Sequence, residues 1–139
     1  MIYVLDTNTC IACLRRPAGL VARRLATVAP GDVALTAVSI TELYRGAYLS
    51  TKVADNLAHV AAFVAPFTTL PLDRHAGETA GRIDADLARQ GLRIGPYDTL
   101  IAAIALLHNL TLVTHNTGEF CRVIGLRLAD WNSSPTEGA

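Results

Sequence analysis

The stretch Ile2-Tyr3-Val4-Leu5-Asp6-Thr7-Asn8-Thr9 decides the fold. Its first four residues are apolar or aromatic without a polar interruption, which is typical of a strand buried on both faces. From Thr9 the apolar residues recur at helical spacing, and this pattern breaks near Pro17. A buried strand that leads directly into a helix is the building unit of a parallel α/β sheet, and Asp6 then lies where the first strand ends.

The same alternation of strand and helix patterns continues along the chain. Further strands are predicted at 33–38, 68–72, 110–114 and 126–129. Helices are predicted at 20–28, from Ser39, at 52–64, at 73–91 with Asp73 as its cap, at 98–108 and, as a short turn or helix, at 117–122. This order predicts an α/β fold, a three-layer α/β/α domain with a mainly parallel central sheet. Residues 1–131 are expected to form this single domain, and 132–139 a polar C-terminal tail.

Composition excludes several classes of protein. The chain has 139 residues, of which 51% are hydrophobic and 17% charged, so it is not of the disordered class. Apolar runs such as Leu100–Leu107 are far shorter than the ~20 residues that span a bilayer, and no secretory signal is recognised. Three cysteines are too few for a disulfide framework and favour a reducing cytoplasm.

Four carboxylates fall where predicted strands end or the following helices begin: Asp6, Glu42, Asp98 and Glu119. Carboxyl ends of parallel strands meet at one edge of a sheet, and ligand sites lie there. Each acid also fits a structural role alone. The two aspartates fit helix caps, Ser39–Glu42 fits a capping box, and Glu119 fits a solvated turn.

The chemistry of such a group points to a cation. Two carboxylates ~5 Å apart repel by about 3 kcal/mol at an effective dielectric constant of 20, so four in one pocket require protons or cations. Oxygen ligands without histidine or cysteine suit Mg²⁺ or Mn²⁺. The predicted reaction is hydrolysis of a phosphate ester by water.

The segments that carry these acids resemble the motifs of the PIN-domain family, and most closely those of its VapC toxins. They are Leu5–Asn8, Ser39–Leu43, Asp98–Ala103 and Thr114–Phe120, and the resemblance extends from about residue 2 to Trp131. It implies a Mg²⁺- or Mn²⁺-dependent endoribonuclease that cuts tRNA or ribosomal RNA and stops translation. It also implies a homodimer and inhibition by a VapB-type antitoxin.

Carried over by position, the resemblance makes the four acids the metal ligands, with Asn8, Thr114 and Asn116 as supporting polar groups. The family more often has aspartate where this chain has Glu119, which leaves that ligand and the number of ions open. Arg15, Arg16 and Arg93 are candidates to hold the RNA backbone. The apolar faces of 39–66 are expected to serve the dimer and the antitoxin.

Other interpretations fit the sequence less well. Cys10 and Cys13 have the spacing of a redox pair, but both fall on an apolar helix face, so core positions are favoured. His115 lies near the predicted site, where it is a candidate RNA contact. A haloacid-dehalogenase-like phosphatase would require a second aspartate at position 8, which is Asn8. The remaining alternative is a PIN-like scaffold that binds RNA or protein without cutting.

Overall fold

The structure is a computed structural model that describes residues 1–132. Its single described sheet has five parallel strands in the order β3-β2-β1-β4-β5. The strands are β1 (Tyr3–Leu5), β2 (Val33–Thr36), β3 (Thr68–Leu70), β4 (Thr111–Val113) and β5 (Leu128–Ala129). The predicted parallel α/β architecture is confirmed, although several strands are shorter than expected.

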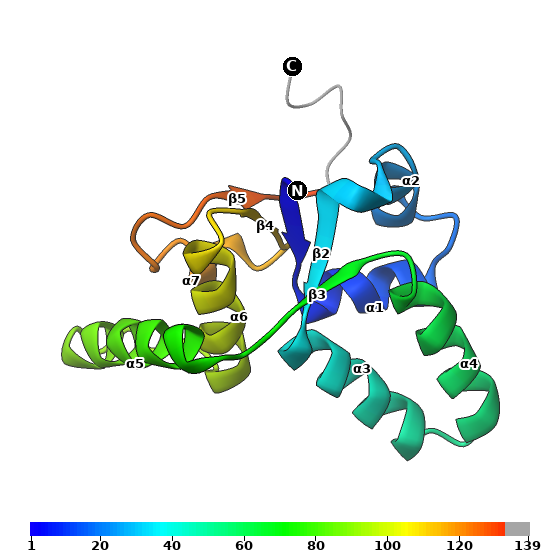
Figure 1. Cartoon of the computed structure of the whole chain (residues 1–139), viewed down its shortest axis with the longest axis horizontal. Helices are drawn as coiled ribbons and strands as arrows, with labels where there is room; N and C mark the ends of the chain where they lie inside the picture. Colours follow the sequence, from blue (N-terminus) through cyan, green and yellow to red (C-terminus); the bar gives the residue numbers. More distant parts are fainter. Residues whose placement is uncertain (133–139) are drawn as a thin grey trace.

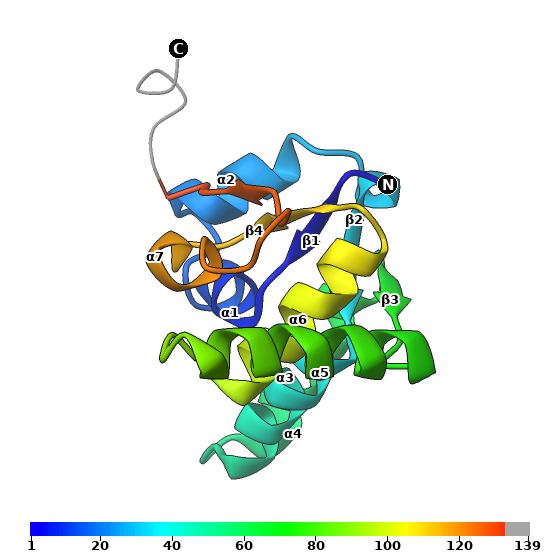
Figure 2. The same cartoon turned by 90° about the vertical axis from the view of Figure 1, so that its left-hand side faces the viewer.

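Helices cover both faces of this sheet. They are α1 (Thr7–Arg15), α2 (Leu20–Ala26), α3 (Ala37–Leu49), α4 (Val53–Val64), α5 (Arg74–Arg89), α6 (Pro96–Leu107) and α7 (Thr117–Phe120), with a short 3-10 helix at Pro30–Asp32. Figure 1 shows α5 and α6 on one side of the strands and α1 to α4 on the other, and Figure 2 shows α5 lying across α6. The layers are therefore those predicted.

Strand alternation divides the core between the two faces. Val4 and Leu112 pack with α5 and α6, whereas their neighbours Leu5 and Val113 pack with α1, α3 and α4. Helix α6 is buried almost all round, as its sequence predicts, and Ile101–Ala105 have no exposed surface. This helix fixes the position of Asp98, which lies in its first turn.

Two of the structural alternatives for the acids are wrong. Helix α3 begins earlier than expected, and its cap is Thr36, whose Oγ1 accepts a hydrogen bond from the Ser39 backbone N at 3.0 Å. The segment Ser39–Glu42 is therefore not a capping box. Gly95 is the N-cap residue of α6, so Asp98 is not a cap either.

The described part of the chain ends at Asn132, and the rest of the predicted tail, 133–139, lies outside the described residues. Within residues 1–132, no helix is both long and apolar enough to cross a membrane.

Candidate functional site

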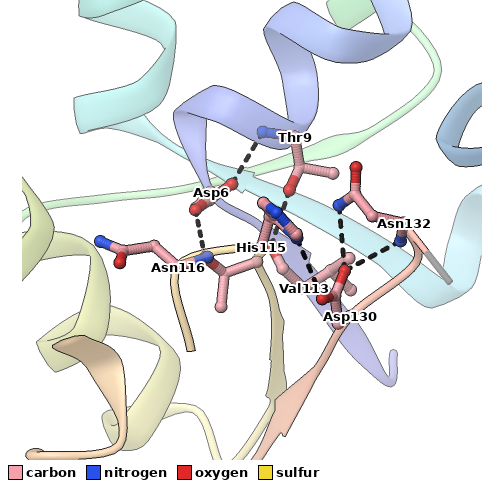
Figure 3. Close-up of polar contacts among 8 residues, drawn as sticks. Asp6, Thr9, Val113, His115, Asn116, Asp130 and Asn132 are labelled. Atoms are coloured by element: carbon pink, nitrogen blue, oxygen red, sulfur yellow. Dashed lines mark hydrogen bonds and ion pairs between the residues drawn. The ribbon is translucent and has the colours of Figure 1, made fainter. Parts of the chain in front are cut away.

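Asp6 occupies the centre of the candidate site, because β1 ends between the ends of β2 and β4. Its side chain is only 2% exposed. Oδ1 accepts from the Thr9 backbone N at 2.8 Å, which caps α1, and Oδ2 accepts from Thr114 Oγ1 at 2.6 Å. Figure 3 shows Asp6 between the start of α1 and the end of β4. The residue thus has both roles considered from the sequence, as a helix cap and as a carboxylate at the sheet edge.

Glu42 is fixed by two hydroxyl groups. Thr7 Oγ1 donates to Glu42 Oε1 at 2.7 Å and lies 2.9 Å from Ser39 Oγ. Because the single hydroxyl hydrogen of Thr7 is directed to the carboxylate, Ser39 must donate to Thr7. Both hydroxyl side chains are buried. This relay joins the start of α1 to α3 and orients the half-buried Glu42 carboxylate.

Glu119 is connected to Asp6 through the segment after β4. Asn116 Nδ2 donates to Glu119 Oε2 at 3.0 Å, and the backbone N of Asn116 donates to Thr114 Oγ1 at 2.9 Å. The same Thr114 hydroxyl donates to Asp6. Glu119 is therefore a half-buried, hydrogen-bonded carboxylate and not a freely solvated turn residue.

The pKa of Asp98 depends in part on the charges of the other three acids. Asp98 is half-buried in the first turn of α6. Burial, and to a smaller extent the negative charges of Asp6, Glu42 and Glu119, together raise the pKa of Asp98 from 3.8 to about 6. Four carboxylates from separate elements therefore act on one another across this edge of the sheet.

The donor set fits a hard divalent cation, because the four acids offer carboxylate oxygens and include no histidine or cysteine. Within residues 1–132, no three His, Cys, Asp or Glu side chains already have the arrangement of an ion site. The carboxylates would have to close on a bound ion by side-chain movement.

The basic candidates lie in different places. Arg15 and Arg16 line a surface hollow of about 520 Å³ between α1 and α2, together with Asn8. Asn8 is exposed and lines this hollow, and among the described residues it forms no hydrogen bond with Asp6. Arg93 is exposed, and its Nε forms an ion pair with Asp84 of α5 at 2.9 Å. A substrate phosphate would therefore compete with Asp84 for Arg93, whereas the hollow presents Arg15 and Arg16 directly.

Cys10 and Cys13 are core residues, as the sequence analysis favoured. Both are buried in the cluster between the sheet, α1 and α3. Burial raises the pKa of Cys10 well above 9.0 and that of Cys13 to about 11, so neither thiol is activated. Within the described part of the chain, no cluster including Cys121 or His115 has the arrangement of a zinc site.

The resemblance named Thr114 as a supporting group, but sequence reasoning missed Thr7 and Ser39, the hydroxyl residues that orient Glu42. Thr7 directly follows Asp6, and Ser39 precedes Glu42 by three residues on the same helix face, so both positions carried a usable signal. Asp130 was also missed. It follows the last strand as the acids follow the earlier ones, and its carboxylate contacts His115 at 3.1 Å.

The fold, with its acidic side chains at the carboxyl edge of a parallel sheet, is that of the PIN class, and comparison with known proteins agrees on this class. The PIN domain family model matches residues 3–126. A tRNA(fMet)-specific endonuclease VapC of Shigella flexneri is 39% identical over 94% of this chain and 98% of its own length. The chain belongs to the PIN domain family and, within it, to the VapC ribonucleases.

Solved structures of similar chains are toxin–antitoxin assemblies. DNA-bound VapBC from Salmonella typhimurium has a chain that matches with a TM-score of 0.89 and 35% identity, covering 94% of this chain and 98% of that one. VapBC2 from Rickettsia felis, bound to a promoter DNA fragment, matches with a TM-score of 0.88 and 30% identity, covering 94% and 99%.

Proposed function

We propose that this chain is a Mg²⁺- or Mn²⁺-dependent endoribonuclease toxin that hydrolyses phosphodiester bonds of structured RNA in the cytoplasm and thereby inhibits translation. The observation that carries the proposal is that Asp6, Glu42 and Glu119 lie near enough to Asp98 for their charges to add to the effect of burial in raising its pKa. A group of this kind is costly for a scaffold to keep, whereas a phosphodiesterase needs it to bind a cation.

The four acids would bind the cation, and neighbouring polar residues orient three of them. A bound divalent cation would neutralise the carboxylates, polarise the phosphate and lower the pKa of the attacking water. Thr114 holds Asp6, Thr7 holds Glu42 and Asn116 holds Glu119, each by a hydrogen bond of 3.0 Å or less. These bonds fix the orientation of three of the carboxylates, which would then close on the ion by small side-chain movements.

The proposed substrate is tRNA, with tRNA(fMet) as the first candidate. The relative from Shigella flexneri is named for that RNA and matches over nearly the whole chain. Arg15 and Arg16 flank the hollow next to the first helix, where they are available to the phosphate backbone. Ribosomal RNA is the alternative structured RNA.

The proposed partner is a VapB-type antitoxin, seated in a groove between α1, α3 and α4. The groove has a volume of about 300 Å³, and Glu42 lies among its lining residues, so an occupant would reach the acidic site. Tyr48 and Leu49, at the end of α3, are 65% and 68% exposed. These apolar side chains extend the docking surface and support a homodimer through the same region. The similar chains from Salmonella typhimurium and Rickettsia felis were solved as VapBC complexes.

The test is cleavage of tRNA by the purified chain freed of any partner, in Mg²⁺, in Mn²⁺ and in EDTA. The wild type is expected to give discrete cuts with either metal and none in EDTA. Asp98→Asn is expected to abolish cutting, while Asp55→Asn, which changes an exposed aspartate on α4, leaves it unchanged. Cuts that survive EDTA or Asp98→Asn would overturn the proposal. RNA binding without any cutting would support the scaffold alternative.

A further inference from the structure

His115 lies beside the candidate site, but its side chain contacts Asp130 and not one of the four acids. It follows Thr114, whose hydroxyl donates to Asp6, and precedes Asn116, which donates to Glu119. Its own side chain is 74% exposed, and its Nδ1 lies 3.1 Å from Asp130 Oδ2. Figure 3 draws the imidazole between the carboxylates of Asp6 and Asp130. The His115 ring is exposed and oriented by Asp130 at the rim of the candidate site, so it can contact a bound ligand.

The group that holds His115 is itself firmly placed. Asp130 Oδ1 accepts from the backbone N of Asn132 at 2.8 Å and from its Nδ2 at 3.0 Å. Trp131, between these two residues, is 3% exposed and packs edge-on against Tyr3, with ring centroids 5.2 Å apart. The turn that carries Asp130 is thus anchored in the core, and it fixes the imidazole.

This turn also borders a hollow of the surface near the site. Asn132 lines the hollow of about 520 Å³ that contains Asn8, Arg15 and Arg16. Hydrogen bonds therefore connect Asn132, at the edge of this hollow, to Asp130 and Asp130 to His115. The arginines of the hollow and the amide groups of Asn8 and Asn132 suit a nucleotide, with a phosphate at the arginines and a sugar or base at the amides.

We propose that His115, oriented by Asp130, binds the ribonucleotide adjoining the cleaved bond, and that the hollow beside Asn132 receives this nucleotide. This role of His115 rests on the proposed RNA hydrolysis, and it gives the path of the RNA strand past the carboxylates. His115 is the substrate-binding residue, and Asp130 is a positioning residue that acts through it.

The hydrogen-bonding capacity of the ring agrees with this role. Burial works to raise the pKa of Asp130, but hydrogen bonds from Asn132 and His115 outweigh it and leave the pKa below its ordinary value. An ionised carboxylate only accepts, so Nδ1 of His115 carries the hydrogen. Nε2 then accepts from a ribose 2′-hydroxyl when the ring is neutral, and it donates to a phosphate oxygen when the ring is protonated. Both partners belong to a ribonucleotide.

The experiment compares His115→Ala, Asp130→Asn and the double variant with the wild type. Binding of fluorescein-labelled tRNA(fMet) is measured by anisotropy in EDTA, and KM and kcat are measured in Mg²⁺. His75→Ala, which removes an exposed histidine on α5, is the matched control. Melting temperatures are recorded for every variant, and an exposed His115 side chain predicts no change for His115→Ala.

His115→Ala is expected to weaken tRNA binding and raise KM by about tenfold, the size of one lost hydrogen bond to substrate, with kcat affected less. The double variant should match His115→Ala alone, because Asp130 acts through the ring. Wild-type cleavage with unchanged binding and KM in His115→Ala would overturn the inference and leave the proposed function standing. A wild type that neither binds nor cuts RNA would overturn both.

Discussion

Replacing Thr114 with valine removes the hydroxyl that connects the site while keeping the shape of the side chain. That hydroxyl donates to Asp6 Oδ2 at 2.6 Å and accepts from the Asn116 backbone N at 2.9 Å, and Thr114 has no exposed surface. A hydrogen bond to a charged group contributes about 1.5–3 kcal/mol, and Asp6 is too buried to replace its donor with free water. We expect Thr114→Val to lower the free energy of unfolding by about 2–3 kcal/mol.

Thr9→Val is the matched control, because Thr9 is also buried but its hydroxyl donates only to the neutral carbonyl of Val113, at 3.0 Å. A neutral hydrogen bond contributes about 1 kcal/mol. Urea unfolding near pH 7, followed by the fluorescence of Trp131, the single tryptophan, measures both variants. Equal losses for the two variants would refute the reasoning that Thr114 supports a buried charge.

Three other outcomes are expected. In EDTA, the free energy of unfolding of the wild type should fall as the pH rises from 3.8 to about 6, because folded Asp98 has the higher pKa and ionises at a cost that the unfolded chain does not have. The contribution of Asp98 is fully present below pH 3.8, where Asp98 is protonated in both the folded and the unfolded chain. Asp98→Asn should therefore flatten this fall, which urea unfolding at several pH values would show. The double variant Arg15→Ala/Arg16→Ala should weaken tRNA binding and reduce the slope of log affinity against log salt concentration by up to about 2. Replacing two arginines of α5 by alanine should leave both the affinity and the slope unchanged. A thiol reagent near pH 8 should modify Cys121 in the native protein and leave the two buried thiols of α1 unmodified, which mass spectrometry can check.

The positions of the acids could be predicted because they depend on one rule of topology. Once Ile2–Leu5 is read as a buried strand, Asp6 must lie at the carboxyl edge of the sheet, and Asp98 follows from the all-round apolar pattern of its helix. The capping alternatives failed at Ser39–Glu42 because a residue outside that segment, Thr36, provides the cap. Strand and helix ends are decided by such single contacts, which periodicity does not contain.

The resemblance named Thr114 and Asn116 as supporting groups, but the hydrogen-bond partners of the hydroxyl residues could not be predicted because they lie far away in the sequence. Thr114 meets Asp6 across 108 positions, and Thr7 meets Glu42 across 35. Their partners depend on the register of neighbouring strands and on the angle between helices, which only the folded chain fixes. The contact between His115 and Asp130 likewise follows from the parallel pairing of β4 with β5.

Direct titration of the metal-free chain with Mn²⁺, by calorimetry near pH 7, tests the central claim that the four carboxylates form a cation site. The account predicts saturable binding for the wild type and for Asp55→Asn, and a loss of at least about tenfold in affinity for Asp98→Asn. The absence of saturable binding to the folded wild type, or equal affinity in Asp98→Asn, would contradict it.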